Sequence, residues 1–238
     1  MNELLLSKRL LTVANEIPIG SKIADIGSDH AYLPCYAVLN GIVSSAIAGE
    51  VNEGPFQSAQ KQVNKLNLQG YIDVRKGNGL EVINPEDVNV ITIAGMGGQL
   101  ICEILEEGKD KLTKVNRLIL QPNVAASNVR KWLIENDWEL INEQILEEDG
   151  KIYEVLTAER GIPDNPYRDV QKKAAAILLG PFLMKTNNAA FKKKWSLELS
   201  NWKKILKQLE QATVTEELVT KRKEIEENIR MVEEVFKQ

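Results

Sequence analysis

Histidine and cysteine are scarce in this 238-residue sequence, which contains one histidine and two cysteines. Cys35 and Cys102 lie far apart and form no Cys-x-x-Cys pair, which argues against a disulfide framework and against a cysteine zinc site. The single histidine, His30, cannot supply a histidine-rich metal centre. We therefore expect a protein that holds no metal ion.

Long hydrophobic runs are lacking as well. No apolar stretch of the sequence approaches the roughly 20 residues that span a bilayer. The N-terminal segment has neither an extended apolar run nor a small-residue cleavage signal, which a secretory leader would show. We predict a soluble, cytoplasmic monomer without a membrane partner.

Short apolar runs alternate with helical patterns in the first part of the sequence. Continuous apolar runs are typical of a parallel sheet that is covered on both faces. Two further strand-like runs, within residues 138–160, are joined at Asp149-Gly150, which is a strong hairpin signal. A Rossmann-like parallel sheet that ends in an antiparallel hairpin is the α/β arrangement of the class I methyltransferases. The expected parallel strands lie within residues 22–27, 46–51, 71–77, 88–98 and 117–123.

The charge is distributed unevenly along the chain. Residues 1–161 have a net charge of −8, whereas residues 162–238 have one of +4. Nine lysines and a single acid, Glu198, lie within residues 172–207. Such a segment suits a polyanionic partner, although a solvated helix face would have the same composition. We predict a Rossmann-like catalytic domain of residues 1–161 and a helical domain of residues 162–238.

Apolar residues recur with heptad spacing in the C-terminal part, which predicts two helices folded back on each other as an antiparallel coiled coil. Such a seam by itself indicates only that the helices pack together. A threonine capping pattern, with Thr213 three residues before Glu216, separates the two helices. The first seam is Trp195, Leu199, Trp202, Leu206 and Leu209, and the second is Leu218, Ile225, Ile229, Val232 and Phe236.

The loop after the first expected strand reads DIGSDHAYLP, residues 25–34. A dinucleotide-binding loop needs a second glycine where Asp29 stands. A carboxylate at that place would repel a pyrophosphate by about 1 kcal/mol at ~4 Å even in water. S-adenosylmethionine has no phosphate, and its sulfonium and ammonium groups are positive. The acidic loop therefore favours this cofactor over NAD or FAD.

The loops after the next three strands should meet at the same edge of the sheet. Glu50 ends the second strand, where a ribose-hydroxyl acceptor is expected, although a surface glutamate would also fit. Asn78, flanked by glycines, could accept a hydrogen bond from an adenine amino group or could form a plain turn. Residues 94–98 could leave room for cofactor and target, or could form a tight strand–helix turn.

The motifs ADIGSDHAYLP, AGEV, TIAGMGG and LILQPN, in this order and spacing, resemble the bacterial tRNA adenine-N1 methyltransferases of the TrmK family, which modify adenine 22 of tRNA. The resemblance covers residues 1–160 closely. It implies an S-adenosylmethionine fold, tRNA as the substrate and a helical extension that helps to hold the tRNA. One departure is Asn78, where many methyltransferases have aspartate. The predicted cofactor-binding residues are Asp25, Gly27, Ser28, Asp29, Glu50, Val51, Gly77, Asn78, Gly79, Ala94, Gly95 and Met96.

Transfer to adenine N1 requires no prior deprotonation, because N1 has an available lone pair. We expect the adenine to be flipped into a pocket that frees N1 from base pairing. A carboxylate or a neutral imidazole could accept from the exocyclic amine and stabilise the developing charge, so the candidate catalytic residues are Asp29, His30 and Tyr32. The candidate tRNA-binding residues are Lys8, Arg9, Gln121, Asn123, Lys192, Lys193, Lys194, Lys203 and Lys204.

Each of these interpretations has a structural alternative. His30 could simply start a helix, Asn123 could be a helix N-cap, and Lys8 and Arg9 could belong to a solvated helix face. Two other functions also fit the pattern. A methyltransferase of the same fold could act on another RNA or on a small molecule, and a small-molecule substrate would leave the lysines of residues 172–207 without a role. A non-catalytic RNA-binding protein is the other, but the intact cofactor loops argue against it.

Overall fold

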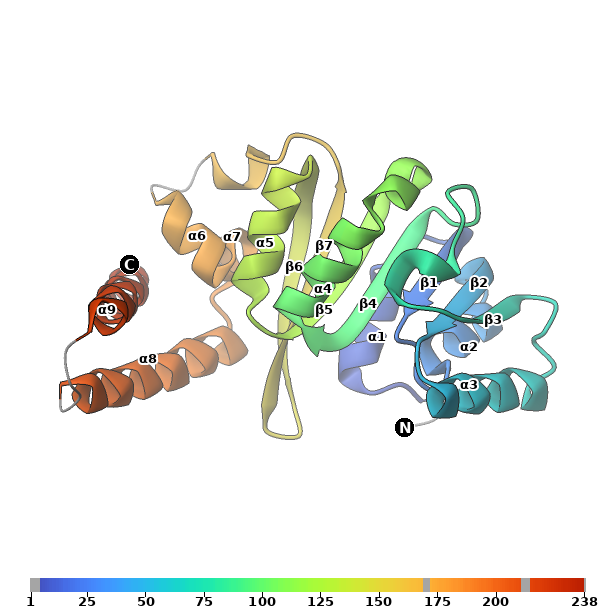
Figure 1. Ribbon diagram of the computed structural model, residues 1–238, viewed down its shortest axis with the longest axis horizontal. Helices are drawn as coiled ribbons and strands as arrows, with labels where there is room; N and C mark the ends of the chain where they lie inside the picture. The colour runs from blue at the N-terminus through green and yellow to red at the C-terminus, as the bar shows by residue number, and fades with distance from the viewer. Residues whose placement is uncertain (1–4, 169–171, 211–214, 238) are drawn as a thin grey trace. The chain divides into compact units, whose positions relative to one another are not determined.

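Figure 1 shows the computed structural model of the chain, in which residues 5–168, 172–210 and 215–237 are described. The chain divides into two compact units, Met1–Asn165 and Pro166–Gln238. The first unit combines a sheet with helices. In the described part of the second unit, the regular structure is helical.

A seven-stranded sheet with the strand order β3-β2-β1-β4-β5-β7-β6 forms the centre of the first unit. The strands from β3 to β5 are parallel, and β7 is antiparallel to both of its neighbours. This confirms the predicted sheet with its terminal hairpin. The strand order reverses between β1 and β4, which is where open α/β sheets bind ligands. The strands are β1 (Ser21–Ile26), β2 (Val43–Glu50), β3 (Ile72–Lys76), β4 (Val90–Gly97), β5 (Arg117–Val124), β6 (Trp138–Glu148) and β7 (Lys151–Arg160).

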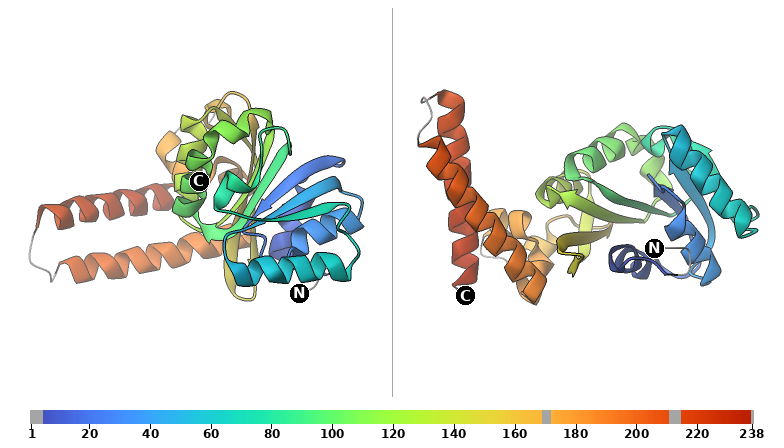
Figure 2. Two further views of the ribbon diagram at one scale, coloured as in Figure 1. Left: turned by 45° about the vertical axis from the view of Figure 1, so that its right-hand side comes forward. Right: turned by 90° about the horizontal axis from the view of Figure 1, so that it is seen from below.

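Helices cover both faces of this sheet (Figures 1 and 2). On one face, Val13, Leu33 and Val63 from the first three helices form one buried cluster with Ile23 and Ile119 of the strands. The next two helices cover the other face. Burial on both sides explains why the strands read as continuous apolar runs. The helices are α1 (Lys8–Asn15), α2 (Tyr32–Leu39), α3 (Glu53–Lys65), α4 (Gly98–Glu107) and α5 (Ala126–Glu135), with 3-10 turns η1 (Gly79–Val82) and η2 (Lys109–Lys114).

The end of β4 differs from the expected glycine-rich turn. The strand continues through Gly97 and pairs with β5, with register shifts on both sides of Met96. Gly95 has a φ of +81° and bonds to side chains of β5. Its N–H donates to Gln121 Oε1 at 3.0 Å, and its carbonyl accepts from Asn123 Nδ2 at 2.7 Å. The result is a β-bulge, which changes the direction of the strand end.

Helix α1 is fastened to the β6–β7 hairpin by two glutamates. Glu148 accepts hydrogen bonds from the backbone N–H groups of Lys8 at 2.5 Å and Arg9 at 3.2 Å. A carboxylate in this position satisfies the unpaired donors and the positive dipole of a helix N-terminus. Glu16, at the other end of the helix, accepts three hydrogen bonds from side chains of β6 and β7. Both ends of α1 are therefore fixed to the hairpin.

The second unit is built on two long helices that pack together as the predicted antiparallel pair (Figure 2). Trp195 and Val232, one from each predicted seam, are buried. Thr215 caps the second long helix by accepting from the Leu218 N–H, whereas the predicted cap Thr213 lies outside the described residues. None of the helices in the described ranges is long and apolar enough to cross a membrane.

At the start of the second unit, one helix begins later than the sequence predicts. The sequence predicts a helix over residues 167–179, but Tyr167 ends a 3-10 turn and the helix begins at Lys173. The 3-10 turn includes Pro166, and residues 169–171 of the predicted helix lie outside the described residues. The elements are η3 (Asn165–Tyr167), α6 (Lys173–Leu179), α7 (Pro181–Thr186), α8 (Ala189–Leu209) and α9 (Glu216–Phe236).

A buried ionic group ties α5 to the hairpin. Arg130 is fully buried. Its Nε lies 2.6 Å from Glu143 Oε1 on β6, and its Nη2 lies 2.7 Å from Glu154 Oε2 on β7. Both carboxylates are themselves buried. One cation between two buried anions is tolerated only while all three groups are in place.

We predict that Arg130→Met lowers the free energy of unfolding by about 3–5 kcal/mol, because two buried carboxylates lose their cation. Urea unfolding of the full chain, followed by tryptophan fluorescence, measures the change. Lys76→Met is the matched control, since Lys76 pairs with Glu53 on the surface and exposed pairs contribute little. Equal losses in the two variants would contradict this role of Arg130.

Candidate active site

The loop between β1 and α2 begins with a buried carboxylate. Asp25 accepts hydrogen bonds from Ser28 Oγ at 2.6 Å and from Thr92 Oγ1 at 2.7 Å. Asp25 and Thr92 are paired in the β1–β4 register. Burial raises the pKa of Asp25, and the two hydroxyl donors offset part of that rise. Asp25 therefore holds the start of the loop to β4.

The loop turns sharply because three of its residues have left-handed backbone. The angle φ is +72° at Gly27 and +54° at both Asp29 and Ala31. Glycine adopts this conformation freely, and aspartate tolerates it better than most residues do. The Asp29 N–H donates to the Glu50 carboxylate, while the Asp29 side chain is exposed. Asp29 thus fixes the loop through its backbone and presents its carboxylate on the open side.

Glu50, the last residue of β2, is buried beside the same loop. Burial raises the pKa of Glu50. The hydrogen bond from the Asp29 N–H lowers the pKa, and the negative charges of Asp29 and Asp25 raise it again. Three carboxylates therefore gather at the ends of β1 and β2. An entering cation would stabilise their ionised forms.

The exposed part of the loop carries two rings and the Asp29 carboxylate. The rings of His30 and Tyr32 are stacked, with centroids 5.2 Å apart and an interplanar angle of 27°. His30 Nε2 lies 3.7 Å from Asp29 Oδ1. The structure therefore brings the three predicted catalytic residues together. His30 also lies just before α2, which is compatible with its alternative interpretation as a helix-start residue.

The ends of β2 and β3 lie side by side. The Gly77 N–H donates to the Glu50 carbonyl at 2.9 Å. Val51 is an apolar side chain that is 53% exposed. Asn78 is exposed and precedes η1, and its N–H donates to Glu81 Oε2 at 3.0 Å. Asn78 therefore forms the turn that the sequence allowed, and the turn lies at the same edge as Glu50.

Met96 of β4 lies over Gly27 of the first loop. A Cβ built on Gly27 would lie 2.1 Å from Met96 Cε. Glycine at this position therefore lets the end of β4 approach the loop closely. The predicted site residues of β4, which are Ala94, Gly95 and Met96, lie beside those of β1 because the two strands are neighbours in the sheet.

The sequence predicts that Gln121 and Asn123 read a base edge. Gln121 is fully buried. Its Oε1 accepts from Arg9 and Gly95, and its Nε2 donates to Asn123 Oδ1 at 3.1 Å. This use of the amide favours a supporting role at the bulge over a base contact. Asn123 is not a helix N-cap, since Ala125 occupies that position in α5.

Lys8 and Arg9 differ although they are adjacent. Lys8 is exposed, whereas the Arg9 side chain is half-buried. Arg9 Nη1 lies 2.6 Å from Gln121 Oε1, and its guanidinium lies 5.5 Å from the ring centroid of Tyr153. The alternative of a solvated helix face is therefore wrong for Arg9.

The other lysines predicted to bind tRNA lie on α8. Lys203 Nζ is 2.6 Å from Glu233 Oε1, and Lys194 Nζ lies 4.9 Å from the centroid of a tryptophan ring. Lys192 and Lys204 are exposed and form no ion pair with the described residues. These two side chains are the simplest to test for contact with an RNA.

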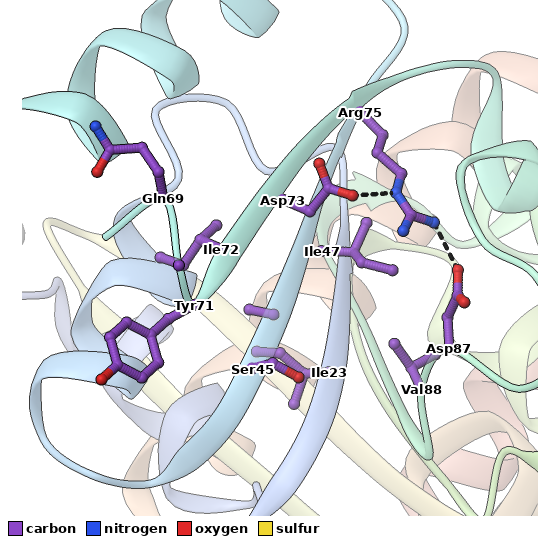
Figure 3. Close-up of a pocket in the computed structure, with 12 residues that line it drawn as sticks. Ile23, Ser45, Ile47, Gln69, Tyr71, Ile72, Asp73, Arg75, Asp87 and Val88 are labelled. Atoms are coloured by element: carbon purple, nitrogen blue, oxygen red, sulfur yellow. Dashed lines mark hydrogen bonds and ion pairs between the residues drawn. The ribbon is translucent and has the colours of Figure 1, made fainter. Parts of the chain in front are cut away.

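A cavity of about 230 Å³ lies against β1, β2 and β3 (Figure 3). At its rim, Arg75 bonds to Asp73 at 2.7 Å and to Asp87 at 2.6 Å. Its lining includes Ile23 and Ser45, from the first halves of their strands, and none of the predicted site residues. This cavity is therefore separate from the carboxyl edge. In the described part of the chain, no cluster of three or more histidine, cysteine or acidic side chains could hold a metal ion.

Thr92 is a site residue that the sequence reasoning missed. It is fully buried within β4, and its hydroxyl binds Asp25. A hydroxyl inside the otherwise apolar run VITIA was the available signal, because a buried hydroxyl requires a hydrogen-bond partner. The partner itself lies on a neighbouring strand, and only the strand order identifies it.

The sheet order, its terminal hairpin and the acidic strand ends define a class I methyltransferase. The family model described as TrmK, tRNA (adenine(22)-N(1))-methyltransferase, matches residues 23–234. The chain therefore belongs to the TrmK family.

Known relatives are similar to this chain over nearly its whole length. The chain is 56% identical over 236 residues to the tRNA (adenine(22)-N(1))-methyltransferase of Bacillus subtilis strain 168, which covers 99% of each protein. The crystal structure of the B. subtilis m1A22 tRNA methyltransferase TrmK is similar, with a TM-score of 0.93 and 55% identity over 98% of this chain and 99% of that one. A Streptococcus pneumoniae protein, Sp1610, solved in complex with S-adenosyl-L-methionine, has a TM-score of 0.80 and 43% identity over 97% and 99%.

We predict that Glu50→Gln raises the free energy of unfolding at neutral pH. Burial raises the pKa of Glu50 above its ordinary value of 4.5, so the folded state binds this proton more tightly than the unfolded chain does. The free energy of unfolding therefore falls as the pH rises from the ordinary glutamate pKa through the folded-state pKa. The glutamine remains neutral and can still accept the Asp29 N–H. Urea unfolding at several pH values should show a gain that disappears below the ordinary glutamate pKa.

Glu53→Gln is the control for this prediction. The hydrogen bond from Lys76 holds the pKa of Glu53 below its ordinary value, so its ionised form is favoured by folding. Neutralising Glu53 should give no gain in stability at neutral pH. A Glu50→Gln protein that is less stable than the wild type at neutral pH would show that the ionised carboxylate supports the fold.

Proposed function

We propose that the chain transfers a methyl group from S-adenosylmethionine to N1 of adenine 22 in tRNA. The observation that carries this proposal is the cluster of carboxylates at the carboxyl edge of the sheet, in a chain that belongs to the TrmK family. Asp29 and Glu50 give this edge its negative charge, and Asp25 holds the loop in place. We further propose a cytoplasmic location, in keeping with tRNA as the substrate.

The residues at this edge fit S-adenosylmethionine. The cofactor carries positive sulfonium and ammonium groups and has no phosphate, which suits a loop that has Asp29 in place of a phosphate-binding glycine. Glu50 uses its carboxylate to accept one N–H and can also accept ribose hydroxyls, as acids at this position do. The exposed Val51 and Asn78 lie further along the edge, where the adenine of the cofactor would bind.

The bound cofactor supplies a methyl group that is activated by its attachment to a positive sulfur. The chain must therefore hold adenine N1 in line with that methyl group, and such positioning can supply much of the rate. The N1 lone pair accepts the methyl group directly, so the adenine becomes cationic. We propose that Asp29 or His30 accepts from its exocyclic amine and stabilises this charge. The Tyr32 ring offers a face for the base.

The basic helix α8 is the proposed tRNA-binding element of the second unit. Lysine side chains on an exposed helix bind phosphates without reading the sequence. We propose this role for Lys192, Lys193, Lys194, Lys203 and Lys204. Packing between α8 and α9 does not require an excess of lysine over acid in residues 172–207, whereas binding to phosphates does.

We predict transfer of one methyl group to a tRNA transcript that has adenine at position 22. Labelled cofactor, nuclease digestion and mass spectrometry identify the modified nucleoside. A reverse-transcription stop locates it, because N1-methylation blocks the pairing edge of adenine. The matched control is the same transcript with guanine at position 22, which should accept no label above background. Equal labelling of both transcripts, or methylation of another atom of adenine, would contradict the proposal.

We predict that the double variant Lys192→Gln/Lys204→Gln binds tRNA more weakly and with a weaker salt dependence. The slope of log K against log salt should fall by about 0.7–0.9 for each phosphate contact that is lost. Filter binding at several salt concentrations measures both quantities. Lys61→Gln, an exposed lysine on α3, is the control and should leave the slope unchanged. An unchanged slope in the double variant would exclude these two lysines from the RNA contact.

A further inference from the structure

We propose that the groove between α4 and α5 binds a linear polyamine, because acidic side chains of both helices line it together with the buried, incompletely hydrogen-bonded amide of Asn136. This site is separate from the carboxyl edge and goes beyond the proposed function. The groove has a volume of about 480 Å³, which lies within the range of small-molecule pockets. Its lining includes Glu103, Glu106, Trp132, Glu135 and Asn136.

The groove lies where two helices end side by side. Helices α4 and α5 follow the neighbouring parallel strands β4 and β5 and pack against each other (Figure 1), so both run away from the carboxyl edge. Neither helix, each of which is described along its whole length, has a basic residue in its last turn. Glu106 lies in the last turn of α4, and Glu135 ends α5. A helix C-terminus carries partial negative charge, which acids increase and a bound cation offsets.

The acids of the groove are only partly neutralised by the protein. Lys109 Nζ lies 3.7 Å from Glu106 Oε1. Glu103 and Glu135 form no ion pair with the described residues. Burial and the negative charges of Glu103 and Glu135 raise the pKa of the Cys102 thiol to about 11. Because Cys102 also lines the groove, the negative charge of both helices reaches its interior.

Asn136 supplies an independent sign that the groove lacks a donor. This residue caps the C-terminus of α5 and is only 9% exposed. Its Nδ2 donates to the Trp132 carbonyl at 2.9 Å, but its Oδ1 is buried and has no hydrogen-bond partner among the described residues. Such acceptors are rare in folded proteins, because burial removes their hydrogen bonds to water. An ammonium group bound in the groove would supply the missing donor.

The arrangement of the acids suits separated cationic groups and not one compact ion. In the described part of the chain, no cluster of histidine, cysteine and acidic side chains could hold a metal ion. Glu103 and Glu106 lie roughly 4.5 Å apart along the axis of α4, and Glu135 lies on the facing helix. A polyamine has ammonium groups separated by short methylene chains. The methylenes can pack on the Trp132 side chain, as the apolar stem of a lysine does on an apolar surface.

Calorimetric titration of the full chain with spermidine tests the assignment. We expect spermidine to bind, and its diacetylated form, in which both terminal amines are blocked, to bind much more weakly. Glu103→Gln/Glu135→Gln should weaken spermidine binding about 3- to 30-fold, as the loss of exposed ion pairs does. Asn136→Ala should weaken it too, because the acceptor is lost. Glu217→Gln/Glu224→Gln, which neutralises exposed acids of α9, is the control of equal charge and should bind spermidine like the wild type.

Other outcomes would overturn the assignment. Equal weakening in both double variants would show that spermidine responds to net charge and not to this groove. Tighter binding of an acetylated trilysine amide, which has the same charge as spermidine, would assign the groove to lysine side chains of a protein. Absence of spermidine binding by the wild type at low salt would exclude the site. Thermal unfolding of each variant verifies the fold, and the exposed pair Glu103 and Glu135 carries the test should Asn136→Ala not fold.

Discussion

A parallel sheet brings the carboxyl ends of its central strands to one edge, and in this protein that edge carries carboxylates whose ionised forms are disfavoured by burial more than they are favoured by their hydrogen bonds. Burial raises the pKa of both Asp25 and Glu50. Burial and the neighbouring Asp29 carboxylate make ionisation of these acids unfavourable. A ligand that brings positive charge would stabilise their ionised forms, and this would strengthen its binding. This constraint selects a cationic cofactor over a dinucleotide, and the proposed function depends on it.

Much of the remaining structure keeps this edge rigid. The Ser28 and Thr92 hydroxyls hold Asp25, and the Gln121 amide holds the Gly95 bulge. Farther away, Arg130 ties α5 to the hairpin, and the same hairpin fixes α1, which carries Arg9. Contacts that are remote from the candidate site thus hold the elements that form it. Such preorganisation is what a reaction governed by positioning requires.

The fold and the acids of the site were predictable from local signals. Continuous apolar runs and Asp149-Gly150 specify the sheet and its hairpin, and Glu50 lies at the end of a predicted strand. The bulge at Gly95 and the inward position of Arg9 were not predictable, because they depend on Gln121. Arg9 and Gln121 lie 112 positions apart in the sequence. Their contact exists only after α1 has packed on the sheet. Helical periodicity indicates which face of α1 is covered, but it does not indicate which side chains of the sheet that helix meets.

The most direct test of the central claim is the number of protons released when S-adenosylhomocysteine binds. Calorimetry at mildly acidic pH, in buffers with different enthalpies of ionisation, measures this number. We expect net proton release by the wild type, because the ammonium of the ligand favours ionisation of the buried acids, and less release by Glu50→Gln. Binding heats that are independent of the buffer, or net proton uptake, would contradict the claim that this edge is poised for a cation.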